Sequence, residues 1–460
     1  MSSTIDPTTT AQQLATAYTQ GAQSQITAQS QDAQATATGL TKLQSVLTAF
    51  ETSLTGLSSS SAASSSSSGL RAYTATLSTS DVGTASASST AAPGTYQFYV
   101  QQLATAQQTV FENLPAVPVA SGGPLTVTLA DGASFSVDLV AADTNNDGTI
   151  SQAEIARAIN QANGNSGKVT ASIATVNGQS ELLLTAGSTG ASQAITLDTS
   201  GLPAGALKTV LDSGRVLTPA QDAIVWLGGQ GGVELQQSSN TLTAIDGVSV
   251  TFTRAQSATE SPVTLTVASD DTTTTANVQK FVDAYNTLKS ALDSLTKLGD
   301  ASSGASAGPL ASDSGVTALR NHLNQLMRQS FGGQSLISLG VAANRDGTLS
   351  LDANRLNKAL SANPQALDQV FGNAGLINNT GMLGSLNKYL MTWTDTVSGQ
   401  INSRQNSVQA LQKRLTARQT DLTNRYSNLY QNYLKQFTQV QALQQQMSQT
   451  SGLFSTSTSS

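Results

Sequence analysis

Apolar residues with heptad spacing lie near both ends of this 460-residue chain. Near the N-terminus, spacings of 3, 4, 3, 4 and 3 separate Leu40, Leu43, Leu47, Phe50, Leu54 and Leu57. Near the C-terminus, Ile401, Val408, Leu415, Leu422 and Leu429 repeat every seven residues, with a second series at Tyr426, Tyr433, Val440 and Met447. No proline interrupts either stretch. Such spacing predicts long helices that pair along an apolar seam, so the two ends are expected to form an antiparallel coiled coil.

The C-terminal stripe has an alternative interpretation as an ordinary core-facing helix, but few globular helices run for more than six heptads. Arg404, Arg418 and Arg425 fall at seam-like positions. They either set the register by reaching a partner or lie at a solvated edge. The segment from Ala11 to Gln34 is poor in large apolar residues, so it is expected to be helical only with a partner.

Between these ends, from Leu70 to Ser269, apolar and polar residues alternate with the period of half-buried strands. Asn177-Gly178 separates two such runs and predicts a β-hairpin. The runs 248–252 and 263–267 are predicted to form another antiparallel pair, and one short helix is expected at 154–161. A serine-rich run at 58–68 predicts a flexible joint.

These patterns predict an α+β fold, in which both termini build a long antiparallel coiled-coil or helical-bundle leg and β-rich head domains are inserted. A further 3, 4, 3, 4, 3 stripe from Val278 to Leu295 places another helix in the leg. The expected parts are terminal coiled-coil helices at 1–42 and 400–460, a helical leg domain at 43–68 and 272–399, an inner β-rich head domain at 69–108 and 216–271, and an outer α+β head domain at 109–215.

Composition argues against several functional classes. The chain has no cysteine and one histidine, His322, so disulfides, thiolate metal sites and histidine clusters are excluded. A net charge of −6 disfavours nucleic acid as a partner, and no apolar run is long enough for membrane insertion. The N-terminus lacks the pattern of a cleaved secretory signal. No P-loop, dinucleotide fingerprint or nucleophile elbow occurs, so no enzyme activity is predicted.

Several collinear motifs resemble the bacterial flagellar filament cap family, also called hook-associated protein 2. The resemblance extends from Leu40 to Phe454, and the order and spacing of the motifs make it specific. The motifs are Pro93–Gln107 (PGTYQFYVQQLATAQ), Ser239-Asn240 with Ile245–Val248, Phe281–Asn286 (FVDAYN), Gly308–Leu310, and Leu339–Val341 with Asp346–Asp352 (DGTLSLD).

The resemblance implies a secreted, extracellular protein at the tip of the flagellar filament, where it promotes flagellin folding and polymerisation. It implies a ring homo-oligomer, most often a pentamer, with heads forming a plate. Flagellin, hook–filament junction proteins and a flagellar export chaperone that binds the C-terminal helix are the implied partners, and export follows the flagellar type III channel. Cell adhesion is a further role known in the family. The family's Gly-rich opening is replaced here by Met1–Asp6.

Two other functional classes remain open from the sequence. Another axial flagellar protein, such as a junction subunit, is disfavoured by the blocks at 281–286 and 346–352. A secreted calcium-dependent adhesin or glycan-binding protein is the alternative from a different class.

The segment Asp143–Glu154 (DTNNDGTISQAE) fits the EF-hand calcium loop at each ligand position, with glycine at the sharp turn. The candidate calcium ligands are Asp143, Asn145, Asp147, Thr149 through its carbonyl, Ser151 and Glu154. A strand-like run precedes the loop, so a calcium loop without its first helix is expected rather than a full EF-hand. No other cofactor is predicted.

The same segment has an alternative interpretation as a polar strand-to-helix turn, with Thr149 or Ser151 capping the helix that starts near Gln152. The set Asn344, Asp346 and Gly347 matches a calcium loop less well and is interpreted as a β-turn.

Overall fold

A computed structural model of the chain describes residues 6–57, 69–176, 178–372 and 380–457. The expected joint at 58–68, the turn residue Asn177 and the residues before Asp6 lie outside the described residues. The chain divides into two compact units, Met1–Leu70 with Thr272–Ser460, and Arg71–Asp271. The finer division into four parts stays a prediction.

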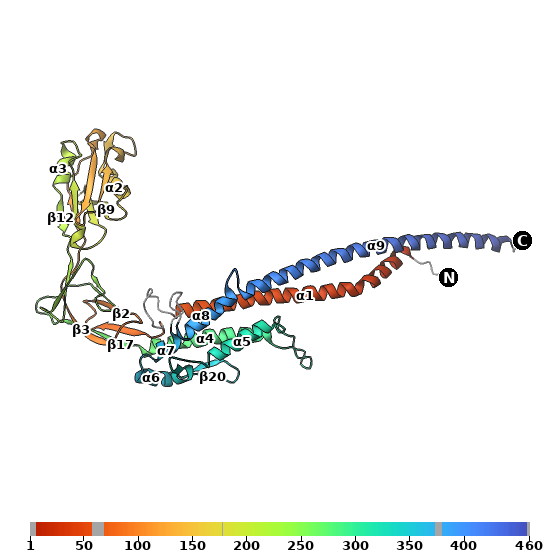
Figure 1. The fold of residues 1–460 in the computed structure, drawn as a ribbon. Coiled ribbons are helices and arrows are strands. Elements are labelled where there is room, and N and C mark those ends of the chain that lie inside the picture. The colour runs from red at the N-terminus through yellow and green to blue at the C-terminus, as the bar shows by residue number, and fades with distance from the viewer. Residues whose placement is uncertain (1–5, 58–68, 177, 373–379, 458–460) are drawn as a thin grey trace. The chain divides into compact units, whose positions relative to one another are not determined.

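The first unit is mainly helical, and its two longest helices come from opposite ends of the chain. Helix α1 spans Pro7–Gly56 and α9 spans Gln400–Ser457. The carboxylate of Asp6 caps α1 by accepting hydrogen bonds from the amides of Thr8 and Thr9, both at 3.2 Å, and Pro7 occupies the first turn, where no N–H is needed. Figure 1 shows α1 and α9 side by side, which confirms the predicted antiparallel leg.

The remaining elements of this unit pack around the C-terminal part of α1 and the start of α9. They are α4 (Asp271–Thr296), α5 (Ser314–Leu326), α6 (Ala353–Ala362), α7 (Ala366–Phe371), α8 (Gly381–Thr394), the short pairs β18 (Ser330–Phe331) with β19 (Gln334–Ser335) and β20 (Val341–Ala343) with β21 (Leu349–Leu351), and a 3₁₀ turn, η4 (Leu336–Leu339). Both predicted stripes, Leu40–Leu57 and Val278–Leu295, are buried in one core.

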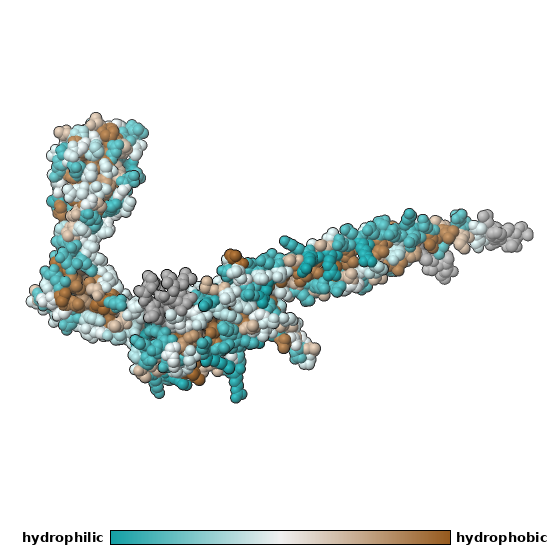
Figure 2. Space-filling model, in the orientation of Figure 1, coloured by the Kyte–Doolittle hydropathy of each residue, from teal (hydrophilic) through white to brown (hydrophobic). Residues whose placement is uncertain are grey.

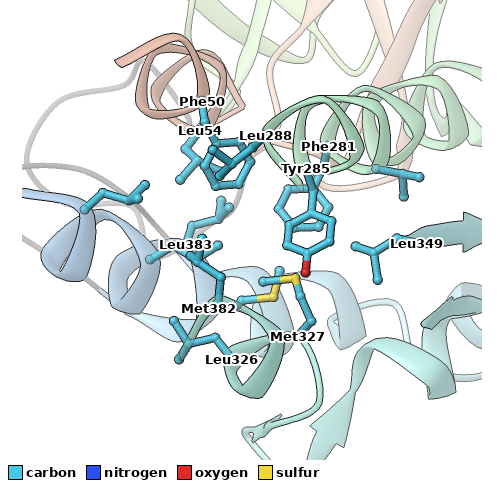
Figure 3. Packing of buried hydrophobic residues seen from close by; sticks show 14 of the residues in the cluster. Phe50, Leu54, Phe281, Tyr285, Leu288, Leu326, Met327, Leu349, Met382 and Leu383 are labelled. Carbon is cyan, nitrogen blue, oxygen red and sulfur yellow. The ribbon is translucent and has the colours of Figure 1, made fainter. Parts of the chain in front are cut away.

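Aromatic rings lie at the centre of this core. Phe281 contacts Phe371 edge to face at 5.1 Å between centroids, and Phe50 contacts both Phe281 and Tyr285 at 6.4 Å. Figure 3 shows Phe50, Phe281 and Tyr285 among leucine and methionine side chains from α1, α4, α8, β21 and the end of α5. The N-terminal stripe Leu40–Leu57 therefore packs against elements more than 200 residues away in the sequence. This packing joins the C-terminal part of α1 to the rest of the helical unit.

The second unit contains two pairs of sheets, each with its own core. The first pair is a five-stranded sheet, in the order β1 (Tyr73–Leu77), β17 (Val263–Ser269), β3 (Gly94–Gln102), β13 (Ala223–Leu227) and β14 (Val233–Gln237), and a three-stranded sheet, in the order β15 (Thr241–Leu242), β16 (Val248–Phe252) and β2 (Gly83–Ala87). Their inward residues form one apolar cluster.

The second pair surrounds a separate apolar cluster. One is a four-stranded sheet in the order β12 (Arg215–Thr218), β4 (Gln108–Phe111), β10 (Gln179–Ala186) and β9 (Val169–Val176). The other is a three-stranded sheet in the order β11 (Ile195–Asp198), β6 (Pro124–Leu129) and β7 (Ser134–Asp138). The helices α2 (Gln152–Gln161) and α3 (Ala206–Asp212), the short pair β5 (Val117–Pro118) with β8 (Thr149–Ile150), and the 3₁₀ turns η1 (Val119–Ser121), η2 (Val140–Ala142) and η3 (Ala191–Gln193) complete it.

One predicted hairpin is confirmed and one predicted pairing is wrong. Strands β9 and β10 pair antiparallel on either side of residues 177–178. Strands β16 and β17 do not pair, because β16 lies between β15 and β2 whereas β17 lies between β1 and β3. Both bury their alternating residues in the same core but from different sheets. The alternation therefore identified the buried face correctly and gave no information about the neighbouring strand.

Candidate functional site

The antiparallel pair of α1 and α9 forms the first candidate site. Ile401 and Leu415 of α9 are 2% and 3% exposed, and Val408 between them is half-buried. On α1 the first half of the seam uses Ala11 and Ala15, both fully buried, and Ile26, which is 4% exposed. Small side chains let the two backbones approach closely, so this end of α1 is helical with α9 as the partner that its composition requires.

Polar side chains fix the register of this pair. Gln23 and Gln419 exchange two hydrogen bonds, at 3.0 and 2.8 Å. Arg418 donates to Gln29 at 3.1 Å, and Arg425 donates to the Tyr18 hydroxyl at 2.8 Å with its guanidinium 5.0 Å from the ring centroid. Both arginines are exposed, so they lie at a solvated edge of the helix pair, and their contacts with α1 also contribute to its register.

The third seam arginine contacts a different helix. Arg404 donates to Asp313 at 2.8 Å, and its guanidinium lies 5.0 Å from the Trp393 ring. Asp313 also caps α5 through the amides of Gly315 and Val316. Burial raises the pKa of Asp313, but the hydrogen bonds from Arg404 and from these amides outweigh it, so its pKa is lowered. Arg404 therefore links α9 to the N-terminus of α5.

The apolar seam of α9 becomes progressively more exposed toward its C-terminal end. Leu422, Tyr426, Leu429 and Tyr433 are half-buried, whereas Val440, Leu443 and Met447 are 41%, 57% and 65% exposed. On α1, Leu14 is 41% exposed. Figure 2 shows apolar surface in brown interspersed with polar surface along the paired helices. The stripe that predicts a coiled coil is thus only partly covered within one chain.

The loop Asp143–Glu154 forms the second candidate site. The carboxylate of Asp143 accepts hydrogen bonds from the amides of Asp147 and Gly148, at 3.3 and 3.0 Å, and Asp147 accepts one from the amide of Thr149 at 2.8 Å. Gly148 has a φ of +82°, which the sharp turn requires. The loop is preceded by β7 and the 3₁₀ turn η2, so it has no entering α-helix, as the sequence predicted.

The end of the loop is also the start of α2. Ser151 caps α2, and the carboxylate of Glu154 accepts hydrogen bonds from the Ser151 amide and hydroxyl, at 2.9 and 2.8 Å. These bonds lower the pKa of Glu154. The capping interpretation is therefore confirmed for Ser151 but not for Thr149.

The structure resolves three other sequence features as structural elements. Gly228–Gly232 forms the turn between β13 and β14. Asn344–Gly347 forms the turn between β20 and β21, with the Gly347 amide donating to the Asn344 carbonyl at 3.0 Å. His322 is half-buried, with its ring centroid 4.0 Å from that of Tyr389.

The described residues contain neither a metal-binding cluster nor a membrane-spanning helix. Within residues 6–57, 69–176, 178–372 and 380–457, no group of three or more His, Cys, Asp or Glu side chains is placed to hold a metal ion. No helix in these same ranges is apolar enough over a sufficient length to span a membrane.

Comparison with known families identifies both ends of the chain. Residues 3–107 match the family Flagellar hook-associated protein 2 N-terminus, and residues 220–449 match Flagellar hook-associated protein 2 C-terminus. The Lateral flagellar hook-associated protein 2 of Vibrio parahaemolyticus is 34% identical over 81% of this chain and 83% of its own length. The B-type flagellar hook-associated protein 2 of Pseudomonas aeruginosa is 29% identical over 89% of this chain and 86% of its own length.

A solved structure also resembles most of this chain. The crystal structure of the flagellar cap protein FliD D1-D2-D3 domains from Escherichia coli superposes with a TM-score of 0.63 at 25% identity. The match covers 80% of this chain and 99% of that structure. Sequence and fold therefore agree on the same set of relatives.

Proposed function

Because this chain belongs to the flagellar hook-associated protein 2 family, whose members cap the flagellar filament, we propose that it forms a ring of identical subunits that promotes flagellin folding and polymerisation. The cap lies outside the cell, at the tip of the filament. The family is one of structural flagellar proteins, and no catalytic role is proposed for this chain.

The observation that supports assembly most directly is the uncovered part of the α9 seam. Val440, Leu443 and Met447 continue the heptad pattern but lack the burial that Ile401 and Leu415 have. Heptad positions that one partner helix leaves exposed favour association with further helices, because burying them removes apolar surface from water. Neighbouring subunits and flagellin are the proposed partners for this surface in the filament.

The finer features of the assembly are proposals as well. We propose that the ring is a pentamer and that hook–filament junction proteins are its contacts before flagellin is added. A flagellar export chaperone is proposed to cover the C-terminal part of α9 before export, because an exposed apolar stripe favours aggregation in a subunit awaiting export. The four-part domain division predicted from the sequence is part of the same proposal.

The alternative of a secreted calcium-dependent adhesin or glycan-binding protein is not favoured. Relatives that align over more than four-fifths of this chain are hook-associated proteins. Adhesion to host surfaces is retained only as an additional role of a cap.

Deleting the gene tests the cap function. We expect the deletion strain to export flagellin into the medium without growing filaments, and the wild-type gene to restore filaments. Filaments of normal length in the deletion strain would overturn the proposal.

Substitutions on α9 test whether the uncovered seam carries assembly. Val440→Ser, Leu443→Ser and Met447→Ser together should leave the fold of the isolated subunit intact, because all three side chains are exposed. The triple variant should sediment as a 47.2 kDa monomer where the wild type forms rings, and should fail to restore filaments. The matched control replaces exposed Gln439, Gln445 and Gln446 by Ser and should assemble normally. Normal rings from the triple variant would show that Val440, Leu443 and Met447 are not needed for ring assembly.

A further inference from the structure

A buried carboxylate oxygen lacks a hydrogen-bond partner at the end of the loop Asp143–Glu154. Glu154 is 3% exposed, and its Oε2 accepts hydrogen bonds from Ser151. Its Oε1 is the single buried side-chain nitrogen or oxygen atom without a partner in the part of the chain that the structure describes. Leaving a buried charged acceptor unpaired is costly, so this atom indicates a missing interaction.

The Glu154 carboxylate ends the same loop that carries Asp143 and Asp147. Hydrogen bonds from Ser151 lower its pKa and burial raises it, with smaller contributions from the Thr144 amide, which lowers it, and from the negative charge of Asp147, which raises it. The Thr144 amide is close enough to influence the carboxylate but does not meet the geometry of a hydrogen bond to Oε1. The unpaired oxygen therefore belongs to a carboxylate that, together with the charge of Asp147, would attract a cation.

We propose that the loop Asp143–Glu154 binds one Ca²⁺ ion, with both oxygens of Glu154 among its ligands. Calcium takes six to eight hard oxygen ligands, and in loops of this pattern the twelfth residue is a bidentate glutamate. Asp143, Asn145 and Asp147 would supply side-chain oxygens, which in this structure accept hydrogen bonds from loop amides. No three carboxylates of the described residues are grouped as a ligand set, so binding requires these side chains to turn toward the ion. This placement gives the unpaired Oε1 the interaction that the protein itself does not provide.

Two further features suit the same ion. The carbonyl of Thr149 is the expected backbone ligand. The Val119 amide donates to the Gly148 carbonyl, which makes Pro118 and Thr149 a non-hydrogen-bonded pair, so the Thr149 carbonyl points away from β5. Ile150 between the ligands is fully buried and pairs with Val117, which anchors the loop to the core of its domain. The ion would therefore hold an otherwise exposed loop against α2 without any catalytic role.

One nearby charge opposes binding. Arg157 of α2 donates a hydrogen bond to the hydroxyl of Thr144, which is a non-ligand position of the loop. With three carboxylates and this guanidinium nearby, affinity is expected in the range of extracellular calcium modules, about 10⁻⁴–10⁻³ M. Calcium-binding modules that work outside the cell have affinities in this range.

Calorimetric titration of the full-length protein with CaCl₂, after treatment with EGTA, tests the proposal. We expect one ion per chain and, in Glu154→Gln, an affinity at least about tenfold weaker, because one ligand charge is lost. Asp147→Asn, in the exposed part of the loop, should weaken binding similarly, and Arg157→Gln should strengthen it severalfold. Asp346→Asn is the matched control, since it alters a similar Asp-Gly turn that has no following glutamate ligand, and it should bind as the wild type does.

Thermal unfolding provides an independent readout. Calcium at ten times its Kd should favour the folded form about elevenfold and raise the unfolding temperature of the wild type, but not that of Asp147→Asn. The absence of calcium uptake by the wild type up to about 10 mM, or unchanged affinity in both Glu154→Gln and Asp147→Asn, would overturn the proposal. Should Glu154→Gln fail to fold, Asp147→Asn alone decides.

Discussion

Asn286 forms two hydrogen bonds to the backbone of Leu349. Its side-chain oxygen accepts from the Leu349 amide at 2.7 Å, and its side-chain nitrogen donates to the Leu349 carbonyl at 2.9 Å. Asn286 ends the FVDAYN motif on α4, and Leu349 lies in the DGTLSLD motif on β21. Two motifs that looked independent in the sequence are thus held together by one amide.

An asparagine side chain forms the same pair of hydrogen bonds to a backbone residue in the second unit. The side chain of Asn240 accepts from the Ala104 amide at 2.7 Å and donates to the Ala104 carbonyl at 2.9 Å. Ala104 belongs to the motif at 93–107, and Asn240 belongs to the next motif along the chain. Only an amide offers a donor and an acceptor at this spacing, which explains why asparagine stands at both positions.

Replacing Asn286 by aspartate should destabilise the helical unit. Asn286→Asp turns the donor into a second acceptor that faces the Leu349 carbonyl, so a hydrogen bond is replaced by repulsion. The expected cost is about 2–3 kcal/mol in the free energy of unfolding, measured by urea denaturation. Asn321→Asp, on an exposed face of α5, is the control and should change stability by less than about 0.5 kcal/mol. Equal stabilities of the two variants would contradict the proposed role of this amide.

Two leucines on α9 allow a matched test of the α1–α9 seam. Leu415 is 3% exposed and Leu411, one turn earlier, is 36% exposed. Leu415→Ala should lower the free energy of unfolding by about 2–3 kcal/mol because it removes buried apolar contacts, whereas Leu411→Ala should cost about 0.5 kcal/mol. Far-UV circular dichroism during denaturation measures both. A larger effect at Leu411 would mean that the seam lies on another face of α9.

Tyr285 should make stability depend on alkaline pH. Burial, with a smaller contribution from the charge of Asp293, raises its pKa to about 12 from the usual value of 10.0. The unfolded chain therefore releases this proton at lower pH than the folded chain does, and stability falls as the pH rises from about 10 to about 12.

Comparison with Tyr285→Phe isolates this effect from the other tyrosines. Between pH 9 and pH 11 the wild type should lose about 1.4 kcal/mol more stability than Tyr285→Phe, as judged by urea denaturation at each pH. Identical pH profiles for the two proteins would show that Tyr285 titrates normally, and hence that it is not held in the core among Phe50 and Phe281.

Periodicity alone predicted much of this fold. The stripes at 40–57 and 278–295 are buried as expected, because a 3.6-residue repeat defines one face of a helix. Small residues concealed part of the seam, since Ala11 and Ala15 were not identified as contact residues although both are fully buried. Their signal was the spacing of four residues, which is weak in an alanine-rich segment.

The neighbours of each strand and the short elements were harder to predict. A period of two could not show that β16 and β17 belong to different sheets, and α3 is too short, at seven residues, to show a clear repeat. The loop Asp143–Glu154 was found from its ligand pattern alone. Its unpaired carboxylate oxygen could be seen only in three dimensions, because it depends on the packing of α2 against the sheets.

A cysteine pair across the leg tests the central claim that α1 and α9 of the same chain pair in the working cap. The chain has no cysteine, so Gln23→Cys with Gln419→Cys introduces one unique pair at side chains that are in hydrogen-bond contact. Filaments grown by a deletion strain that carries this variant should contain cap subunits with an internal disulfide. On non-reducing gels such subunits run as monomers, and the mismatched pair Gln23→Cys with Gln405→Cys should remain reduced. Caps linked only between chains, or an unlinked matched pair in growing filaments, would contradict this arrangement.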